Sequence, residues 1–508
     1  MNQQPTIQSN KFRHESRHFW KQPAKLTIFS AAFFFGWILV VPFEGQVLRG
    51  LMERENMEVL TLSVFSMGIH LLGLLTSALM VKSIKTAHVV MITAIGWCLA
   101  ASLLLFVPLP HLWHSAVLSM AYVSGLFVAA WGVFLKEAVS PKLRYKAVID
   151  VLVISNVLMI LIDITTINWQ VRAGKLLALL LLVIALTASW RLRSLLEKDS
   201  VKPDMLMESS VTQGMKPSLA RPFAWLCLFI MIITLNSGLM YQVVMPSFFQ
   251  FPMLTSIYWA IPYIAALLLL RNLPQQVNRA HTLYLALAMM GLGYLLFMRL
   301  PVDAGSFIVI NTLMLGALGV FDLFWWSLMA SFLDYSSRPA AVLGIGLGAN
   351  VLGIFAGGLV GQYMLSTPDG QGEITLLAFT IVFIGLAVLP LVNGELSRLF
   401  HRHVFLVNLQ PVTITPPAET RGDEPMVAII TPDPMEVLRE MHQLTEREVE
   451  VVGLLCRGYT YRAISETLGI TDHTTKFHAK NIYQKLQVNN KMELIKIITP
   501  LINSDFNE

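Results

Sequence analysis

The sequence predicts an all-α protein in two parts: a polytopic membrane module and a small soluble helical domain behind it. Of the 508 residues, 55% are hydrophobic and 14% are charged, and the mean hydropathy is +0.61. A soluble domain carries about 25% charged residues, so this deficit indicates a membrane protein. From Leu444 onward the pattern changes to a polar, basic series of short helices with helix-turn-helix spacing.

Twelve apolar runs are long enough to cross a bilayer, which takes about 20 residues of helix. They lie near 26–43, 59–81, 88–107, 113–135, 147–168, 174–191, 222–245, 254–270, 281–299, 305–333, 341–365 and 374–393. A charged stretch, 192–221, divides them six and six. The membrane module is therefore predicted to span 26–393, and Pro246, Pro252 and Pro262 interrupt the region of the seventh and eighth runs.

The placement of Lys and Arg in the loops predicts the orientation of these helices. With the basic N-terminal arm, 1–25, inside, five basic residues fall in exterior loops: Arg49, Arg54, Arg172, Lys175 and Arg299. Fifteen fall in interior loops: Lys82, Lys85, Lys136, Lys142, Arg144, Lys146, Arg191, Arg193, Lys198, Lys202, Lys216, Arg221, Arg271, Arg279 and Arg338. We therefore expect both termini to lie in the cytoplasm.

A proline-rich linker, 394–440, is predicted between the two parts. Its central prolines are Pro411, Pro416, Pro417, Pro425, Pro432 and Pro434. Proline at this density cannot continue a helix and favours an extended, semi-stiff spacer. If flexible, the 24 residues 411–434 would span roughly 25–30 Å root-mean-square, which would hold the last domain near the bilayer.

The last domain, 441–503, is predicted to contain four helices. Thr445 and Glu448 have the spacing of a capping box at the start of the first helix. The expected boundaries are Thr445 to Gly458, 461 to Gly469, Thr471 to about Leu486, and 490 to 499. This is the arrangement that lays one helix in the major groove of DNA.

The third of these helices has a basic and polar face. Lys476, Lys480 and Asn481 lie three to five residues apart, and His478 and Lys485 lie close by. Helical neighbours at these spacings share a face. The simpler interpretation is a solvated basic helix in a small bundle.

The residues of this domain resemble the LuxR-type helix-turn-helix family. The opening pattern L-T-x-R-E-x-E-V is matched by Leu444, Thr445, Arg447, Glu448, Glu450 and Val451, and the signature T-V-K-x-H-x-x-N-I-Y-x-K-L-x-V by Thr474, Lys476, His478, Asn481, Ile482, Tyr483, Lys485, Leu486 and Val488. The departures are Thr475, Lys491, Tyr461 and Arg462. The resemblance implies that Lys476 and Lys480 reach base edges, that Thr474 and Lys485 contact phosphates, and that the last helix makes a homodimer on DNA.

The membrane module resembles the major facilitator superfamily in its six-plus-six topology. The loop between spans two and three, 81–87, lacks the G-x-x-x-D-[RK]-x-G-[RK]-[RK] pattern usual in those transporters. Polar groups in spans are functional candidates; here they are Glu44, His70, Asn156, Asp163, Asn236, Gln242, Asn311, Asp322 and Asn350. Because spans one, four, seven and ten line the cavity of the resembled fold, the candidate ligand-binding residues are Glu44, Trp131, Asn236, Gln242, Asn311 and Asp322.

Structural roles are the alternative for several of these residues. A lone Asn in a span usually makes an interhelical hydrogen bond, Glu44 is placed to lie at the membrane interface, and His70 suits packing. In the eleventh run, glycines four and five residues apart predict close helix packing: Gly344, Gly348, Gly353, Gly357 and Gly361.

No catalytic motif supports an enzyme, and neither a metal site nor a cofactor is expected, because the three cysteines have no paired spacing. The sequence therefore predicts a membrane-integrated one-component transcriptional regulator. In it the membrane module senses a small-molecule ligand or partner, and the last domain binds promoter DNA, with adjacent genes as the expected targets. The alternatives are a secondary transporter with a regulatory DNA-binding tail, and a DNA anchor without signal input.

Overall fold

The computed structural model describes residues 22–43, 45–53, 59–199, 217–273, 280–366, 370–397, 444–456, 459–468, 470–486, 488 and 493–494. The chain forms two compact units, Met1–Pro411 and Val412–Glu508. Glu44, residues 1–21 of the arm, most of the central loop and residues 398–443 of the linker lie outside the described residues, as does all but 493–494 of the last predicted helix.

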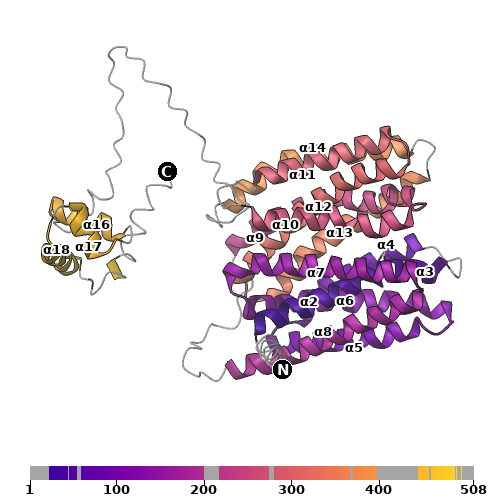
Figure 1. Ribbon diagram of the computed structural model, residues 1–508, viewed down its shortest axis with the longest axis horizontal. Coiled ribbons are helices and arrows are strands. Elements are labelled where there is room, and N and C mark those ends of the chain that lie inside the picture. Colours follow the sequence, from indigo (N-terminus) through magenta and orange to yellow (C-terminus); the bar gives the residue numbers. More distant parts are fainter. Residues whose placement is uncertain are drawn as a thin grey trace, which may run out of the picture. The chain divides into compact units, whose positions relative to one another are not determined.

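The first unit contains twelve helices, among the described residues, that are long and apolar enough to span a membrane. The prediction of twelve spans is confirmed. Their α-helical parts are α2 (Pro23–Val40), α4 (Val59–Met80), α5 (Ile84–Leu104), α6 (Pro110–Ala138), α7 (Pro141–Asn168), α8 (Val171–Asp199), α9 (Pro217–Leu239), α10 (Ala260–Asn272), α11 (Ala280–Arg299), α12 (Ala304–Phe332), α13 (Pro339–Leu365) and α14 (Gly370–Ser397). A short helix, α3 (Gln46–Met52), follows the first span. Figure 1 shows α11 and α14 at one edge of the bundle and α5 and α8 at the other.

Proline starts several of these helices. Pro23, Pro110, Pro141 and Pro339 occupy the first turns of α2, α6, α7 and α13. A first-turn residue has no intrahelical partner for its N–H, so proline there loses no hydrogen bond and its fixed φ suits the helix. These prolines mark where the four helices begin.

The prolines in the seventh and eighth spans accompany changes of helix type. After α9 the chain forms a π-helix, η2 (Met240–Val244), and a 3-10 turn, η3 (Pro246–Phe248). The eighth span starts as a second π-helix, η4 (Leu254–Tyr258), before α10. The ring of Pro262 would clash with the carbonyl of Tyr258 four residues earlier, which is where η4 ends. Wider turns of this kind commonly occur at functional sites.

The two sets of six helices pack on each other along α4 with α13 and along α7 with α10 and α12. The glycines of α13 permit this approach. A Cβ on Gly344 would collide with the carbonyl oxygen of Leu74 in α4, and a Cβ on Gly357 with that of Leu235 in α9. The predicted small-residue packing is therefore present, with one glycine facing the other half and one facing its own half.

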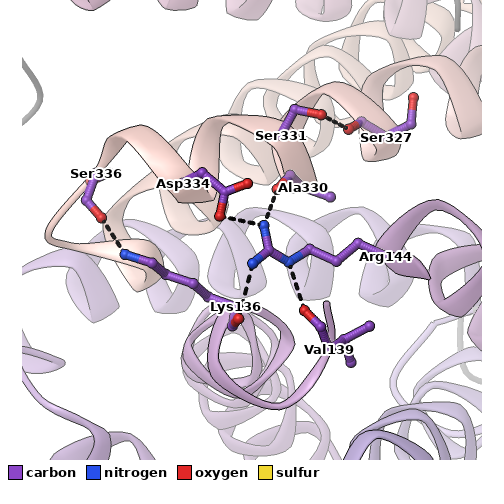
Figure 2. A network of polar contacts seen from close by, with 8 residues as sticks. All are labelled: Lys136, Val139, Arg144, Ser327, Ala330, Ser331, Asp334 and Ser336. Carbon is purple, nitrogen blue, oxygen red and sulfur yellow. Dashed lines mark hydrogen bonds and ion pairs between the residues drawn. The ribbon is translucent and has the colours of Figure 1, made fainter. Parts of the chain in front are cut away.

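At the end of the bundle where α2 begins, a polar network joins the two halves (Figure 2). We call it the Arg144 network; it comprises Lys136, Val139, Arg144, Ala330, Asp334 and Ser336. The side chain of Arg144 is 5% exposed, and its Nη1 lies 2.7 Å from the carboxylate of Asp334 in the 3-10 turn η5 (Leu333–Tyr335). It also donates to the carbonyl oxygens of Lys136 (3.0 Å) and Val139 (3.1 Å) after α6, and of Ala330 (3.3 Å) in α12.

This arginine thereby satisfies carbonyl groups at the C-terminal ends of two helices, one from each half. Such carbonyls have no partner within their own helix and carry the negative end of the helix dipole. Lys136 adds a bond from Nζ to the carbonyl oxygen of Ser336, 2.9 Å long. Nearby, Arg271 of α10 pairs with Asp150 of α7 at 2.7 Å.

A second set of contacts joins the halves near the opposite end. Gln46 of α3 donates from Nε2 to Ser256 Oγ of η4 at 2.7 Å. The guanidinium carbon of Arg49 lies 3.6 Å from the ring centroid of Phe249, which is a cation–π geometry. The bundle is therefore held together across the halves on both sides of its middle.

The second unit contains α16 (Glu446–Cys456), α17 (Tyr461–Leu468) and α18 (Asp472–Lys485). Its core includes Val451, Leu455, Ile464 and Ile482. The predicted capping box is confirmed: Thr445 N donates to Glu448 Oε2 at 2.9 Å, and Glu448 N to Thr445 Oγ1 at 3.3 Å. Thr471 caps α18, as expected, by accepting from the N–H of Thr474.

Hydrogen bonds of the Schellman type close the ends of these helices. Tyr459 N donates to the carbonyl of Leu454, and Ile470 N to that of Ser465, at 3.1 and 3.0 Å. Gly458 and Gly469, which were predicted to end the helices, lie outside the described residues. The bonds that flank them fall where the sequence places the two turns.

Candidate nucleic-acid interface and membrane cavity

The exposed face of α18 is the candidate nucleic-acid interface. Its exposed side chains at helical spacing are His473, Lys476, Phe477, Lys480 and Gln484. Lys476 also pairs with Asp472 one turn earlier, Nζ to Oδ2 2.7 Å, and both side chains are about half exposed. An exposed ion pair of this kind contributes little free energy. Phosphate or base groups of DNA can therefore replace the carboxylate as the partner of Lys476 with little loss of stability.

The other predicted DNA-binding residues on α18 lie deeper. His478 and Asn481 are half-buried, and Thr474 is half-buried with its hydroxyl 2.7 Å from that of Thr471. Thr475, which stands where the family usually has valine, is fully buried and donates to the carbonyl oxygen of Thr471 at 3.2 Å. The departure from valine is therefore accommodated by a hydrogen bond.

Lys485 makes a contact that its sequence position does not reveal. Its Nζ lies 2.7 Å from Oε2 of Glu448, whose side chain is 4% exposed. Burial opposes the ionisation of Glu448, but the bonds from Lys485 and from Thr445 outweigh it and lower the pKa of this carboxyl. One carboxylate thus caps α16 and anchors the end of α18, so Lys485 has a structural partner as well as its predicted phosphate.

Phe477 belongs to the exposed face although the sequence analysis did not single it out. Its side chain is 57% exposed, between Lys476 and Lys480 along the helix. The buried positions Thr475, Ala479 and Ile482 recur every three or four residues, and Phe477 falls between them on the other side. An apolar side chain on a DNA-reading helix suits contact with the methyl group of thymine.

A cavity of about 290 Å³ lies between the two halves of the membrane unit. Spans one, four, seven and ten each contribute to its wall, as expected, and so do α4, α7, α10 and α13. Its aromatic wall is formed by Phe35, Phe43, Tyr241, Phe249, Trp259, Tyr263, Trp325 and Trp326. Among the described residues, three side chains that carry formal charge line it: Arg49, Asp163 and Asp322.

Of the predicted ligand-binding residues, Asp322 lines this cavity. Trp131, Asn236, Gln242 and Asn311 are buried outside its lining, and Glu44 lies outside the described residues. Trp131 donates to the carbonyl of Thr27, Asn236 to that of Ala378 and Asn311 to that of Trp259. Gln242 accepts from Gln362 at 3.4 Å. These hydrogen bonds join neighbouring helices. They match the structural role that the sequence offered as the alternative to ligand binding for a lone polar residue in a span.

Other polar residues do reach the cavity: His70, Asn156, Asp163 and Asn350, all in apolar runs, and Gln46 and Arg49 from α3. The sequence analysis treated Arg49 only as a loop charge, because nothing in the sequence shows that α3 folds back against the bundle. Asp163 accepts from the backbone N–H of Gln46 at 3.0 Å and has Arg49 as a charged neighbour.

Comparison with known proteins identifies the small domain. Residues 442–498 match the family described as bacterial regulatory proteins, luxR family. DegU of Brevibacillus brevis, a transcriptional regulatory protein, is 41% identical over 61 residues, which are 12% of this chain and 26% of DegU. The transcriptional regulator MalT of Vibrio cholerae is 29% identical over 111 residues, 22% of this chain and 12% of MalT. The chain thus spans about a quarter or less of the length of these two relatives.

Solved structures resemble the membrane unit. A bacterial homologue of the iron transporter ferroportin in its outward-facing state superposes with a TM-score of 0.56 at 13% identity, covering 74% of this chain and 99% of that one. The human organic anion transporter MFSD10 gives 0.53 at 15% identity, covering 73% and 99%. At these identities the likeness shows the fold alone.

The fold and the site therefore define a multi-pass membrane protein whose bundle of twelve spans has the fold of these solved structures. Its C-terminal domain is a LuxR-type helix-turn-helix domain, which implies DNA binding.

Replacing Lys480 by alanine is expected to relax the choice between DNA sequences. A base-edge contact is worth about 1–3 kcal/mol at its base pair, or roughly tenfold to a hundredfold in discrimination. The measurement is selection of binding sequences by the full-length protein, followed by competition between single-base variants. The control is Arg447→Ala, which removes the same charge from α16 and should lower the affinity for all DNA sequences alike. If Lys480→Ala also lowered the affinity for all sequences equally, the base-reading role would be contradicted.

The stability of the small domain is expected to fall as the pH drops through the carboxyl range. The pKa of Glu448 is lower in the folded state than in the unfolded state. The ionised side chain therefore contributes its full stabilisation above the unfolded-state pKa of about 4.3, and this stabilisation is lost as the pH falls through the folded-state pKa. Glu448→Gln should lower stability by about 1–3 kcal/mol at pH 7 and flatten this dependence. Hydrogen exchange of peptides from α16 and α18 in the full-length protein measures both effects.

The matched control is Glu450→Gln on the same helix, where the carboxylate is about half exposed and pairs with an equally exposed Arg447. It should change protection by less than about 1 kcal/mol. Equal effects of the two substitutions would show that the Glu448–Lys485 contact does not hold α18 in place.

Proposed function

We propose that this protein is a one-component transcriptional regulator of the bacterial cytoplasmic membrane. The observation that carries the proposal is the presence, in one chain, of a cavity-bearing transporter-like bundle and a LuxR-type helix-turn-helix domain. A ligand in the cavity would change the arrangement of the two halves, and the C-terminal domain would act on promoter DNA accordingly. The loop charges support a cytoplasmic position for both termini.

A sensor of this kind needs two states, and the contacts between the halves would differ between them. A ligand shifts an equilibrium only by its difference in affinity for the two states. The cavity is lined from both halves, and the Arg144 network joins them at the end expected to face the cytoplasm. A ligand that draws the halves together around the cavity therefore competes with or reinforces this network.

The C-terminal domain is reached through α14, the last span. α14 packs against α9 and α11, and Glu395 near its end pairs with Arg221 of α9 at 3.2 Å. Both partners belong to the second half, so the end of α14 moves with that half. A change in the angle between the halves would move the start of the linker and, through it, the domain that binds DNA.

Transcript profiling tests the regulatory role. A strain with the full-length protein is compared with one carrying Lys476→Ala and Lys480→Ala together, which leaves the chain in the membrane. We expect a small set of transcripts, including adjacent genes, to lose regulation in the double variant, because the two lysines of α18 that are predicted to reach base edges are removed. Unchanged transcripts at equal protein levels would contradict the proposal. Robust saturable uptake by reconstituted protein, without any transcript effect, would instead support a transporter.

Weakening the Arg144 network should change the same transcripts without added ligand. Asp334→Asn removes a charged hydrogen bond across the halves, worth about 1.5–3 kcal/mol, which shifts a two-state ratio by about tenfold or more. Glu395→Gln is the matched control, because it removes an ion pair within one half. Transcripts that respond equally to both variants would show that the network does not couple the halves to DNA binding.

A further inference from the structure

Asp322 is a carboxylate in the middle of a spanning helix with no basic partner among the described residues. Tyr263 Oη donates to Oδ2 at 2.8 Å, and Trp325 Nε1 donates to Oδ1 at 3.2 Å. No Lys, Arg or His nitrogen of the described chain lies within 4 Å of it. The other acid of the cavity, Asp163, differs in having Arg49 as a charged neighbour.

The accessible part of Asp322 faces the cavity. The residues before and after it in α12, Phe321 and Leu323, are buried, whereas Asp322 is half-buried and belongs to the cavity lining. A carboxylate has about four lone-pair sites and here uses two. Capacity to accept hydrogen bonds therefore remains on the side where a ligand would sit.

Aromatic rings line the same cavity as this carboxylate. Trp325 and Trp326 stack with centroids 4.9 Å apart, and Tyr241 meets Trp259 edge-on at 6.5 Å. All four rings and that of Tyr263 line the cavity. The faces of such rings attract cations, most strongly when water is excluded.

A second acceptor in the cavity is unoccupied. Oδ1 of Asn350 in α13 is buried and has no hydrogen-bond partner among the described residues, and Asn350 lines the cavity. A buried acceptor without a partner costs free energy that a donor on a ligand would recover. Together, Asp322 and Asn350 favour a ligand that carries N–H donors and positive charge.

Other ligand classes fit less well. Among the described residues no group of three His, Cys, Asp or Glu side chains could hold a metal ion. An anion would meet two carboxylates, and the guanidinium of Arg49 already covers the ring of Phe249. A neutral ligand would leave the Asp322 carboxylate uncompensated in a low-dielectric site.

We propose that the cavity binds an organic ammonium ion with an aromatic or apolar body, its charged group against Asp322 and its body against the aromatic wall. The proposal rests on the proposed function in taking this cavity as the sensing site. Asp322 lies eight residues before Ala330 on the same helix, roughly 12 Å along its axis. A ligand held by Asp322 therefore acts on the helix that the Arg144 network holds at its end.

Binding to the full-length protein in nanodiscs tests the proposal with three probes of similar size: 2-phenylethylammonium, 2-phenylethanol and phenylacetate. Calorimetry and tryptophan fluorescence report binding without DNA. We expect saturable binding of the cation, at least about tenfold weaker binding of the alcohol, and none of the carboxylate.

Asp322→Asn keeps the shape of the side chain and should weaken cation binding at least about tenfold while leaving the affinity for the alcohol unchanged. Asp322→Glu restores the charge and should recover part of the affinity, which separates loss of charge from misfolding. Asp163→Asn is the matched control and should have a smaller effect, because it leaves Asp322 intact. No saturable cation binding, equal affinity for cation and alcohol, or unchanged binding by Asp322→Asn would overturn the proposal.

The outcome is independent of the regulatory test. Cation binding without any transcript effect of the α18 double variant would support the ligand class and contradict the regulator. Transcript control by the double variant in a protein that binds no cation would do the reverse.

Discussion

The Arg144 guanidinium is the contact on which the arrangement of the two halves most depends. It is almost fully buried, lies near the start of α7, and bonds to carbonyl groups at the ends of α6 and α12 and to the carboxylate of Asp334. A cation in the first turn of its own helix gains nothing from that helix dipole, so its stabilisation comes from the two C-terminal ends it faces. Lysine offers one charged centre and could not reach these carbonyls together, because only arginine has donors fixed in a planar fork.

The small domain uses the same principle at smaller scale. Glu448 is nearly buried and is held by donors from Thr445 and Lys485, so a single carboxylate closes the start of α16 and fixes the end of α18. Buried charges are tolerated in both units because each has several donors or acceptors. Asp322 differs in the kind of donor: both of its donors are neutral, no cation among the described residues pairs with it, and it lines the cavity.

Local sequence patterns predicted the helices, whereas the residues that line the sites depend on contacts between residues far apart in the chain. The span count, the Thr445–Glu448 box and the glycine packing of α13 follow from periodicities of a few residues, and all are present. The partner of Lys485 could not be predicted, because Glu448 lies 37 residues away in the chain. The same reason explains why Asn236 and Asn311, chosen for their spans, bond to neighbouring helices rather than line the cavity. The exposure of Phe477 was predictable from the spacing of the buried residues of α18.

The loop between spans two and three shows how this bundle differs from the transporters it resembles. The glycine, the aspartate and the paired basic residues of that pattern are absent there, and Ser83 and Thr86 instead cap α5 through a reciprocal pair of hydrogen bonds. Contacts across the halves at this end come from Arg144 with Asp334 and from Arg271 with Asp150. α12 carries Asp322 in the cavity and also accepts a hydrogen bond from Arg144 through Ala330. A charged ligand in the cavity and the contacts between the halves at this end therefore both act on α12. That shared helix is the physical reason to expect that a ligand too small to touch the end of the bundle still changes how the two halves meet there.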